Sequence, residues 1–456
     1  MSLDKASYLK KAFNNIVSLK KQADGCIKSK KTLLKSISAH VNSDFDVYYA
    51  VKNLKDNPQY LRELIMESPV SITHCSAYML AKETNARASN VILQMINNKE
   101  DEFEQSIGLL IFGARIREIN ENRITSNESL NSTELVHPFL NSKNELLQLY
   151  ATFSLMWMQT PQAENVLRDF ASHNPDCATG KMINNLLPAG KTIHSLPSRI
   201  VDWMDVGHHL TSFFRYPLIY NELKDEIKSH PDNFTVWEAG CSVGLTTESI
   251  SITLNNEINK QSNKASVNII GTEINPFTLW YAKRGVYLLD YGNIGALKTK
   301  KGTEKHYIKH YFRTAKLNES IIEDYFSQKT GTVSGAVISA AKRDLYPISF
   351  LHDDITSEYS QISDDSVDII IYTNVHHELH KDLAKALEKI KKKLKNGGKI
   401  YLIDPKRETY LLFNWYFGNP IKSLSDECDK ICIYQKQKYN SLIPNRSDLF
   451  HITYGF

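Results

Sequence analysis

The sequence predicts an α/β protein in which a doubly wound parallel sheet forms the C-terminal half and an all-α region precedes it. Up to about residue 200, apolar residues recur at the spacing of amphipathic helices, and few strand-like runs occur. From residue 234 onward, short runs rich in Val and Ile alternate with helical patterns, which is typical of strand–helix–strand units. A length of 456 residues allows two or three domains. We therefore expect a helical region over residues 1–200 and an α/β domain over residues 201–456.

The N-terminal region contains four runs with apolar residues near helical spacing: Leu61–Ile65, Val91–Ile96, Ile107–Ile116 and Leu146–Met156. The polar stretch 120–133, rich in Asn, Ser and Thr, predicts a linker between two helical subdomains. No internal repeat is recognisable in the sequence. Two roles for these helices stay open: a lid over a ligand site, or the interface of a homodimer.

Five strand-like runs define the C-terminal sheet: Phe234–Glu238, Val267–Glu273, Ile348–Asp353, Val367–Thr373 and Lys399–Asp404. In a doubly wound sheet, ligands bind beyond the carboxyl ends of the strands, where the strand order reverses. Polar residues stand at four of these ends: Glu273, Asp354, Asn374 and Asp404. The sequence therefore places the chemistry at that edge of the sheet.

The first of these strands runs into a small-residue loop and then into a helix. Gly240, Ser242 and Gly244 would let a ligand approach bare backbone, and the helix N-terminus would offer it N–H groups. The loop lacks both the Lys-Ser/Thr of a triphosphate loop and the Gly-x-Gly-x-x-Gly of dinucleotide sites. A single nucleoside without a pyrophosphate fits better, and S-adenosylmethionine is the leading candidate cofactor. We expect Glu238 and Cys241 to line its site with the three loop residues.

Acidic residues at the next strand ends suit the remainder of such a cofactor. Glu273, with Ile274 beside it, can accept hydrogen bonds from both ribose hydroxyls; the alternative is a solvated strand-end carboxylate. Either Asp353 or Asp354 can accept from the adenine amino group; the alternative for Asp354 is a helix N-cap.

Five ordered motifs lie in this half of the chain: His209–Pro217, which contains Phe-Phe-Arg; Trp237–Gly244; Gly271–Asn275, followed by Ala282–Tyr287; Thr373–Val375; and Leu394–Leu402, which contains a Gly-Gly turn. From about Gly207 onward, the chain thereby resembles the chemotaxis-receptor methyltransferases (CheR-type). These are class I S-adenosylmethionine-dependent enzymes with a Rossmann-like sheet. Phe-Phe-Arg ahead of the glycine loop is the most specific of the motifs.

The resemblance implies roles for residues outside the glycine loop. It implies that Arg215 contacts the cofactor and is needed for activity. It also implies cofactor contacts for His209 and Thr211, in the same segment, and for Asn374 and Val375, after the fourth strand. An Arg at this place would hold the cofactor carboxylate by a charge-assisted bond.

A long segment, residues 286–346, lies where this family inserts a small β-subdomain, which docks a receptor peptide in some members. The stretch Thr330–Val337 predicts a hairpin within this segment. A surface insertion without a binding role is the alternative.

The departures from the family pattern leave the methyl acceptor open. His209 replaces an Asn, and Leu245 replaces the first Glu after the glycine loop. Val375–His380 looks more like the Asn-Val-x-His-His element of small-molecule methyltransferases. A protein carboxylate, such as a glutamate, is already ionised and needs no base, whereas an alcohol or amine would need one, for which His376 and His377 are candidates. A non-catalytic cofactor-binding protein is the third hypothesis.

Bulk composition limits the other partners. A net charge of +4 argues against an extended nucleic-acid surface, and the lysine-rich run 388–395 predicts the solvated face of an amphipathic helix. The six cysteines form no Cys-x-x-Cys pair, and no signal peptide or membrane span is recognisable, so we expect a cytoplasmic protein. His376 and His380 stand four residues apart without a third ligand, so we expect no metal site.

Overall fold

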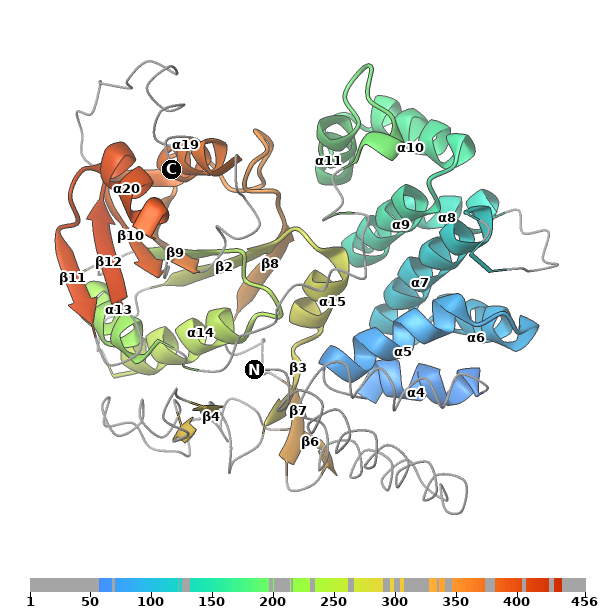
Figure 1. The fold of residues 1–456 in the computed structure, drawn as a ribbon, viewed down its shortest axis with the longest axis horizontal. Helices are drawn as coiled ribbons and strands as arrows, with labels where there is room; N and C mark the ends of the chain where they lie inside the picture. The colour runs from blue at the N-terminus through green and yellow to red at the C-terminus, as the bar shows by residue number, and fades with distance from the viewer. Residues whose placement is uncertain are drawn as a thin grey trace, which may run out of the picture. The chain divides into compact units, whose positions relative to one another are not determined.

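The computed structural model of the chain divides into two compact units (Figure 1). The helical unit comprises residues 1–207, 284–292 and 326–341, and the sheet unit comprises residues 208–283, 293–325 and 342–456. The structure describes residues 57–67, 70–121, 123–124, 132–196, 200, 214, 216–229, 234–260, 266–289, 296–298, 304–306, 328–333, 336–340, 347–373, 382–403, 407–425 and 430–436.

The described helices of the helical unit are α4 (Pro58–Glu67), α5 (Val70–Lys82), α6 (Ala86–Ile96), α7 (Glu102–Asn120), α8 (Ser132–Leu140), α9 (Glu145–Met158), α10 (Pro161–His173), α11 (Ala178–Leu186) and the short 3-10 helix η1 (Ile193–Ser195). Each even-numbered helix packs against the helix that follows it, and α7 packs against both α5 and α9. Figure 1 shows the resulting stack of helical hairpins. The hairpins repeat in space although no repeat is recognisable in the sequence.

Helices α7 and α9 form the centre of this stack. Helix α7 is buried from Glu104 to Ile116, and α9 is buried from Tyr150 to Met158. The two helices can approach closely because Gly113 has no side chain. A Cβ atom at Gly113 would lie 2.7 Å from the Cα of Ser154 in α9.

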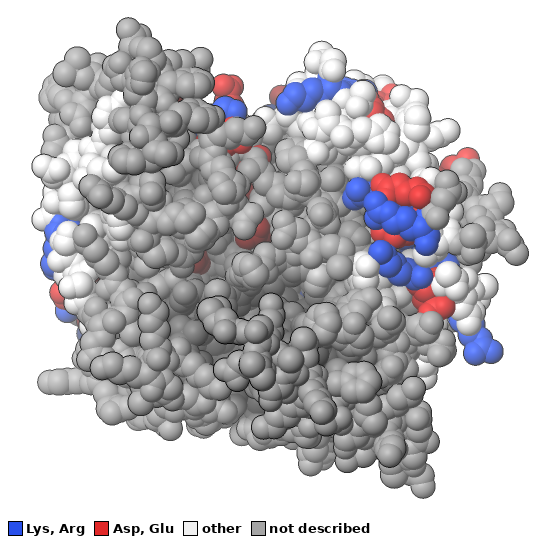
Figure 2. All heavy atoms as spheres, in the orientation of Figure 1, with Lys and Arg blue, Asp and Glu red and all other residues white. Residues whose placement is uncertain are grey.

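Opposite charges are intermixed on the outside of the helical unit, as the described residues in Figure 2 show. Arg117 pairs with Glu121 one turn later on the same helix, with 2.8 Å between Nε and Oε1. Arg123 pairs with the buried Glu118, with 3.0 Å between Nη1 and Oε1. These charges are therefore partnered within the unit.

The sheet unit contains a seven-stranded sheet with the order β11-β12-β10-β9-β1-β2-β8. Its strands are β1 (Phe234–Ala239), β2 (Val267–Glu273), β8 (Ile348–His352), β9 (Val367–Thr373), β10 (Leu394–Ile403), β11 (Lys422–Ser425) and β12 (Lys430–Gln435). The first five run parallel to one another, and β12 is antiparallel to both β10 and β11. The five predicted strands are all present, and the α/β fold class is confirmed.

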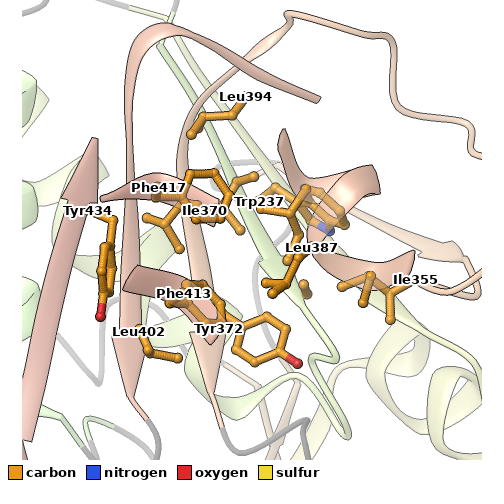
Figure 3. Close-up of a cluster of buried hydrophobic side chains, with 14 of the residues drawn as sticks. Trp237, Ile355, Ile370, Tyr372, Leu387, Leu394, Leu402, Phe413, Phe417 and Tyr434 are labelled. Atoms are coloured by element: carbon orange, nitrogen blue, oxygen red, sulfur yellow. The ribbon is translucent and has the colours of Figure 1, made fainter. Parts of the chain in front are cut away.

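Helices α13 (Pro217–Ser229), α14 (Leu245–Ile258), α15 (Pro276–Arg284), α19 (Leu383–Lys393) and α20 (Arg407–Phe417) accompany this sheet. One core cluster lies between the sheet and helices α19 and α20, and Figure 3 shows Trp237, Ile370, Tyr372, Leu387 and Phe413 within it. The rings of Tyr372 and Phe413 have centroids 5.3 Å apart. Apolar packing thus holds α19 against the strands that carry the site.

The segment between β2 and β8 contains further strands: β3 (Val286–Leu289), β4 (Ala296–Lys298), β5 (Glu304–His306), β6 (Gln328–Val333) and β7 (Ala336–Ala340). Strands β6 and β7 pair antiparallel, with Val333 opposite Ala336, which confirms the predicted hairpin. Together with β3 they form a three-stranded sheet in the order β3-β7-β6.

Among the described residues, no helix is both long enough and apolar enough to span a bilayer.

Replacing Gly113 with Ala should destabilise the helical unit, although Ala favours a helix, because the new methyl group would push against the backbone of α9. Overpacking of this kind costs about 1–3 kcal/mol. The midpoint of thermal unfolding, followed by circular dichroism, would report the loss. Gln94→Ala, at an exposed position of α6, is the control and should change stability by less than about 0.5 kcal/mol. Unchanged stability in Gly113→Ala would contradict the close crossing.

Candidate cofactor site

The site is built where the strand order of the large sheet reverses. Strand β1 lies between β2 and β9, and the chain passes from β1 through α14 to β2 on one side. Strand β9, which comes after β8, lies on the other side of β1. Because these strands are parallel, their carboxyl ends meet at one edge, and the loops there diverge to leave room for a ligand.

The loop after β1 has an unusual backbone that exposes its amide groups. Gly240, Ser242 and Gly244 have φ values of 77°, 52° and 87°, in the left-handed region. The N–H groups of Gly240 and Cys241 both donate to the carbonyl oxygen of Thr272 in β2, at 2.9 and 2.8 Å. The loop is therefore held against the end of β2, and α14 begins directly after it.

Glu273 joins this loop to the one after β2. Its Oε2 accepts from the N–H of Ser242 at 3.0 Å, and its Oε1 accepts from the N–H groups of Ile274 at 2.8 Å and Asn275 at 2.9 Å. The prediction placed Glu273 at the ribose, and the structure brings its carboxylate to the glycine loop. The same side chain thus shapes the loop that the cofactor would meet.

Glu238 lies beneath the loop rather than at its surface. The residue is 2% exposed, and the hydroxyl of Thr247 in α14 donates to its carboxyl group. Burial raises the pKa of Glu238 to about 8, with a further increase from the charge of Glu273 and an opposing effect from the hydrogen bond of Thr247. This side chain therefore keeps its proton at neutral pH and ties β1 to α14. Burial likewise raises the pKa of Cys241 in the loop.

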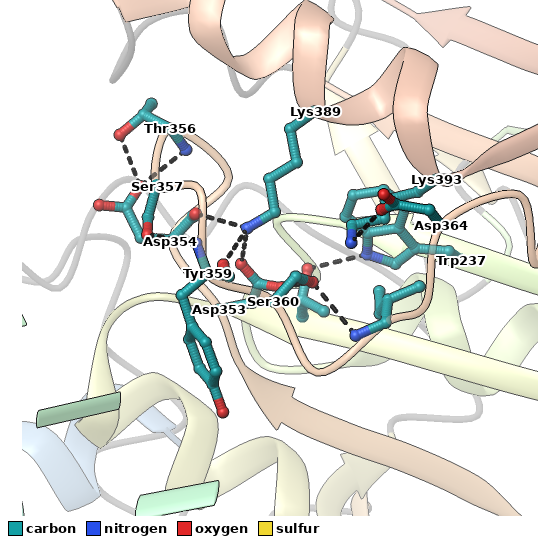
Figure 4. A network of polar contacts seen from close by, with 12 residues as sticks. Trp237, Asp353, Asp354, Thr356, Ser357, Tyr359, Ser360, Asp364, Lys389 and Lys393 are labelled. Carbon is teal, nitrogen blue, oxygen red and sulfur yellow. Dashed lines mark hydrogen bonds and ion pairs between the residues drawn. The ribbon is translucent and has the colours of Figure 1, made fainter. Parts of the chain in front are cut away.

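The two aspartates after β8 have different surroundings (Figure 4). Asp353 is 6% exposed, pairs with Lys389 of α19, and accepts from the hydroxyl of Ser360 at 2.5 Å. Asp354 is only partly buried, and its Oδ1 accepts from the N–H of Thr356 at 2.9 Å and from its hydroxyl at 2.7 Å. The geometry therefore favours Asp354 over Asp353 as the residue that meets a ligand.

His352 lies at the candidate site and was not singled out from the sequence. Its buried Nε2 donates to the carbonyl oxygen of Ile274, with 2.9 Å between the atoms, and so links the end of β8 to the loop after β2. Burial lowers the pKa of His352 to about 4, so the ring is neutral at physiological pH. The only sequence signal was its place directly before the two aspartates at a strand end.

Several predicted residues lie outside the described part of the structure: His209, Thr211, Arg215, Asn374, Val375, His376 and His377. The neighbour of one of them is described. Phe214 precedes Arg215, is fully buried, and donates from its N–H to the hydroxyl of Ser249 in α14 at 2.9 Å. The Ser249 hydroxyl in turn donates to the carbonyl oxygen of Leu245, the first residue of α14. Phe214 is thus attached within about one helical turn of the glycine loop.

Comparison with protein families shows what this arrangement is. The model described as "CheR methyltransferase, SAM binding domain" matches residues 209–316, and the model described as "Methyltransferase domain" matches residues 327–402. The C-terminal half of this chain is an S-adenosylmethionine-dependent methyltransferase domain. The predicted CheR-type resemblance, the enzyme class and the cofactor are thereby confirmed.

Several similar solved structures carry the name methyltransferase or a related description. One, from Methanococcus maripaludis, is 14% identical, covers 50% of this chain and 88% of its own, and has a TM-score of 0.28. A TehB-like protein from Corynebacterium glutamicum is 13% identical; the alignment covers 52% of this chain and 93% of that protein, with a TM-score of 0.27. An RNA methyltransferase from Salinibacter ruber, in complex with S-adenosyl-L-homocysteine, is 11% identical. The alignment covers 50% of this chain and 94% of that protein, with a TM-score of 0.25. No curated protein matches the chain significantly.

Replacing Glu273 with Gln should weaken the binding of S-adenosylhomocysteine, because an amide group cannot accept all three backbone hydrogen bonds. Hydrogen bonds to charged groups contribute about 1.5–3 kcal/mol each, so we expect a loss of at least tenfold in affinity, measured by calorimetry. The matched control is Glu257→Gln, which changes a carboxylate at the far end of α14. Equal affinities in the wild type and Glu273→Gln would show that the site is misplaced.

Glu238 predicts a pH dependence of stability in the cofactor-free protein. Its pKa of about 8 in the folded state lies above the value of about 4.3 in an unfolded chain. The folded protein therefore binds the proton more tightly than the unfolded chain. The contribution of Glu238 to the free energy of unfolding is thus complete at low pH and is lost as the pH rises through 8. As the pH is raised from 5 to 8.5, the midpoint temperature of thermal unfolding should fall further for the wild type than for Glu238→Gln, whose side chain cannot ionise. Parallel pH profiles of the two proteins would refute this.

Proposed function

We propose that the methyltransferase domain transfers a methyl group from S-adenosylmethionine to a carboxylate of a protein, as a glutamate methyl ester. The match of residues 209–316 to the CheR cofactor-binding domain carries this proposal. That match begins ahead of the glycine loop and includes the Phe-Phe-Arg segment, which is the feature most specific to the chemotaxis-receptor enzymes.

The residues at the strand ends fit the cofactor. The loop 240–244 presents backbone with little side-chain cover at Gly240 and Gly244, ahead of the N-terminus of α14. In our proposal, Glu273 accepts from the ribose hydroxyls and Asp354 accepts from the adenine amino group, while Glu238 supports the loop from beneath. S-adenosylmethionine, when bound, supplies a methyl group activated by its sulfonium. Contacts from His209, Thr211, Ile274, Asn374 and Val375 stay predictions.

Arg215 is proposed to hold the cofactor carboxylate and to orient an acidic acceptor. Support comes from its neighbour, because the backbone N–H of Phe214 is bound to Ser249 in the second turn of α14. Phe214 has a positive φ of 54°, and its ring packs edge-on against Tyr220 with centroids 5.3 Å apart. The hydrogen bond and the ring packing therefore hold the backbone directly before Arg215 in this conformation.

A carboxylate acceptor requires little chemistry from the protein beyond positioning. A glutamate side chain is ionised at neutral pH and needs no base before it attacks. Methyl transfer is an in-line displacement, so the chain contributes mainly by orienting the two reactants and excluding water. The family resemblance supplies a further expectation, that the inserted β-strands, including the β6–β7 hairpin, dock a peptide of the acceptor protein.

A small-molecule alcohol or amine is the second candidate acceptor. Residues 327–402 match the general methyltransferase model rather than the CheR model, and this range includes the Val375–His380 element. For such an acceptor, His376 or His377 would act as the base. Dimerisation through the N-terminal helices, the domain boundary near residue 200 and a cytoplasmic location also stay predictions.

The chemistry of the product distinguishes the two acceptors. With radiolabelled S-adenosylmethionine and an extract of proteins as substrate, we expect label on protein that mild base releases as methanol. Methyl esters hydrolyse under these conditions, whereas methyl ethers and methylamines do not. Arg215→Ala should lose most of the labelling. Base-stable label on a metabolite would contradict the proposal and support the second candidate.

A double variant, His376→Ala with His377→Ala, provides an independent check. General bases contribute about 10²–10⁴ to a rate. If the acceptor is a carboxylate, the double variant should retain a rate within a few-fold of the wild type at saturating substrate. A loss of a hundredfold or more would instead indicate that a proton is removed from the acceptor.

A further inference from the structure

We propose that Lys389 is a positioning residue that holds Asp354 in the orientation needed to recognise adenine. The inference rests on the proposed contact between Asp354 and the adenine amino group. It does not depend on the identity of the methyl acceptor.

The ammonium group of Lys389 reaches from α19 into the turn that follows β8 (Figure 4). It donates to the carboxylate of Asp353, to the carbonyl oxygen of Asp354 at 2.8 Å, and to the carbonyl oxygen of Tyr359 at 2.8 Å. An ammonium group has three N–H donors, so each of them has a partner in this one turn. The side chains of Lys389 and Asp353 are only 5% and 2% exposed.

The turn is closed around that ammonium group by its own side chains. The second carboxylate oxygen of Asp353 accepts from Ser360, at the other end of the turn. The Oδ1 of Asp354 is bound by both the N–H and the hydroxyl of Thr356. Asp354 is consequently held at two places, its carbonyl by Lys389 and its carboxylate by Thr356, and these bonds set the direction of the carboxylate.

Packing alone does not explain a buried charge pair at this position. Burial lowers the pKa of Lys389 and raises that of Asp353, because water no longer solvates either charge. Buried ion pairs often contribute no more stability than apolar residues of similar volume, and in our inference the directional bonds of this pair serve to select one geometry of the turn. The three bonds of Lys389 therefore act mainly on the shape of the turn that carries Asp354.

Lys393 provides a matched comparison on the same face of α19. It lies four residues later and donates to Oδ1 of Asp364 at 2.6 Å. Asp364 is 61% exposed and lies just before β9, at the amino end of that strand rather than at the carboxyl edge. The ion pair of Lys393 therefore lies outside the turn at Asp354, although its positive charge contributes to lowering the pKa of Lys389.

The test compares two ligands that differ at the purine amino group. S-inosylhomocysteine has an oxygen where S-adenosylhomocysteine has the amino group, so a carboxylate that accepts from this amino group discriminates between them. Each would be titrated calorimetrically into full-length protein. The variant pairs Lys389→Met with Asp353→Asn, so that no unpaired charge is left buried. Lys389→Arg, which keeps the charge but not its compact geometry, is a second variant for the case that the first does not fold.

We expect the wild type to prefer the adenosyl ligand by at least about tenfold, as for a site that hydrogen-bonds its ligand. Both Lys389 variants should lose most of this preference through weaker binding of the adenosyl ligand, with less than about threefold change for the inosyl ligand. Lys393→Met should leave both affinities unchanged.

Other results would overturn the inference. If the Lys389 variants lose affinity equally for the two ligands, Lys389 has a general structural role. If their preference for the adenosyl ligand is that of the wild type and neither affinity changes, Lys389 has no role in binding. Asp354→Asn separates the underlying assumption from the inference. If Asp354→Asn abolishes the preference and the Lys389 variants retain it, only the role of Lys389 is wrong. If Asp354→Asn also retains the preference, Asp354 does not recognise adenine, and both statements are wrong.

Discussion

The candidate cofactor site depends on one carboxylate that accepts hydrogen bonds from the backbone of two loops. A loop with glycines at its ends can approach a ligand closely, but it lacks the side chains that would otherwise hold its shape. Glu273 supplies the missing restraint, because it binds the N–H of Ser242 in the loop after β1 and two N–H groups directly after β2. The parallel register makes this possible, since Ala239 lies opposite Thr272 and Glu273 follows at the next position. A shift of one residue would turn this side chain to the other face of the sheet.

The turn beyond β8 is held in a different way, by the side chain of Lys389 in α19, which lies 35 residues after Asp354 in the sequence. Lys389 can reach that turn only because its neighbours in α19, including Leu387 and Ile390, pack into the apolar core against the sheet. An apolar helix face thus determines where a buried cation lies. His352 adds a second link from the same region to the loop after β2. The loop after β2, proposed to meet ribose, and the turn after β8, proposed to meet adenine, are therefore joined by a hydrogen bond at the end of β8.

The centre of the helical unit is organised by close packing of its helices. Its hairpins stack through the central helices α7 and α9, whose approach requires a residue without a side chain at Gly113. Stacked hairpins need only an apolar face on each helix, so similar architecture can arise without a recognisable sequence repeat. This accounts for a regular unit in a stretch where the sequence predicted helices but no repeat.

The sequence by itself determined the features that depend on neighbouring residues. Alternation of Val- and Ile-rich runs with helices identified the five parallel strands, and the glycine loop with acidic strand ends identified the cofactor class. The β6–β7 hairpin was also predicted, because its signal is local. Tertiary structure decided what depends on residues far apart in the chain. It distinguished Asp354 from Asp353 through Lys389, buried Glu238 under the loop so that its pKa rises, and attached Phe214 to Ser249. Burial and long-range hydrogen bonds are properties of the packed domain, so no local pattern in the sequence could have shown them.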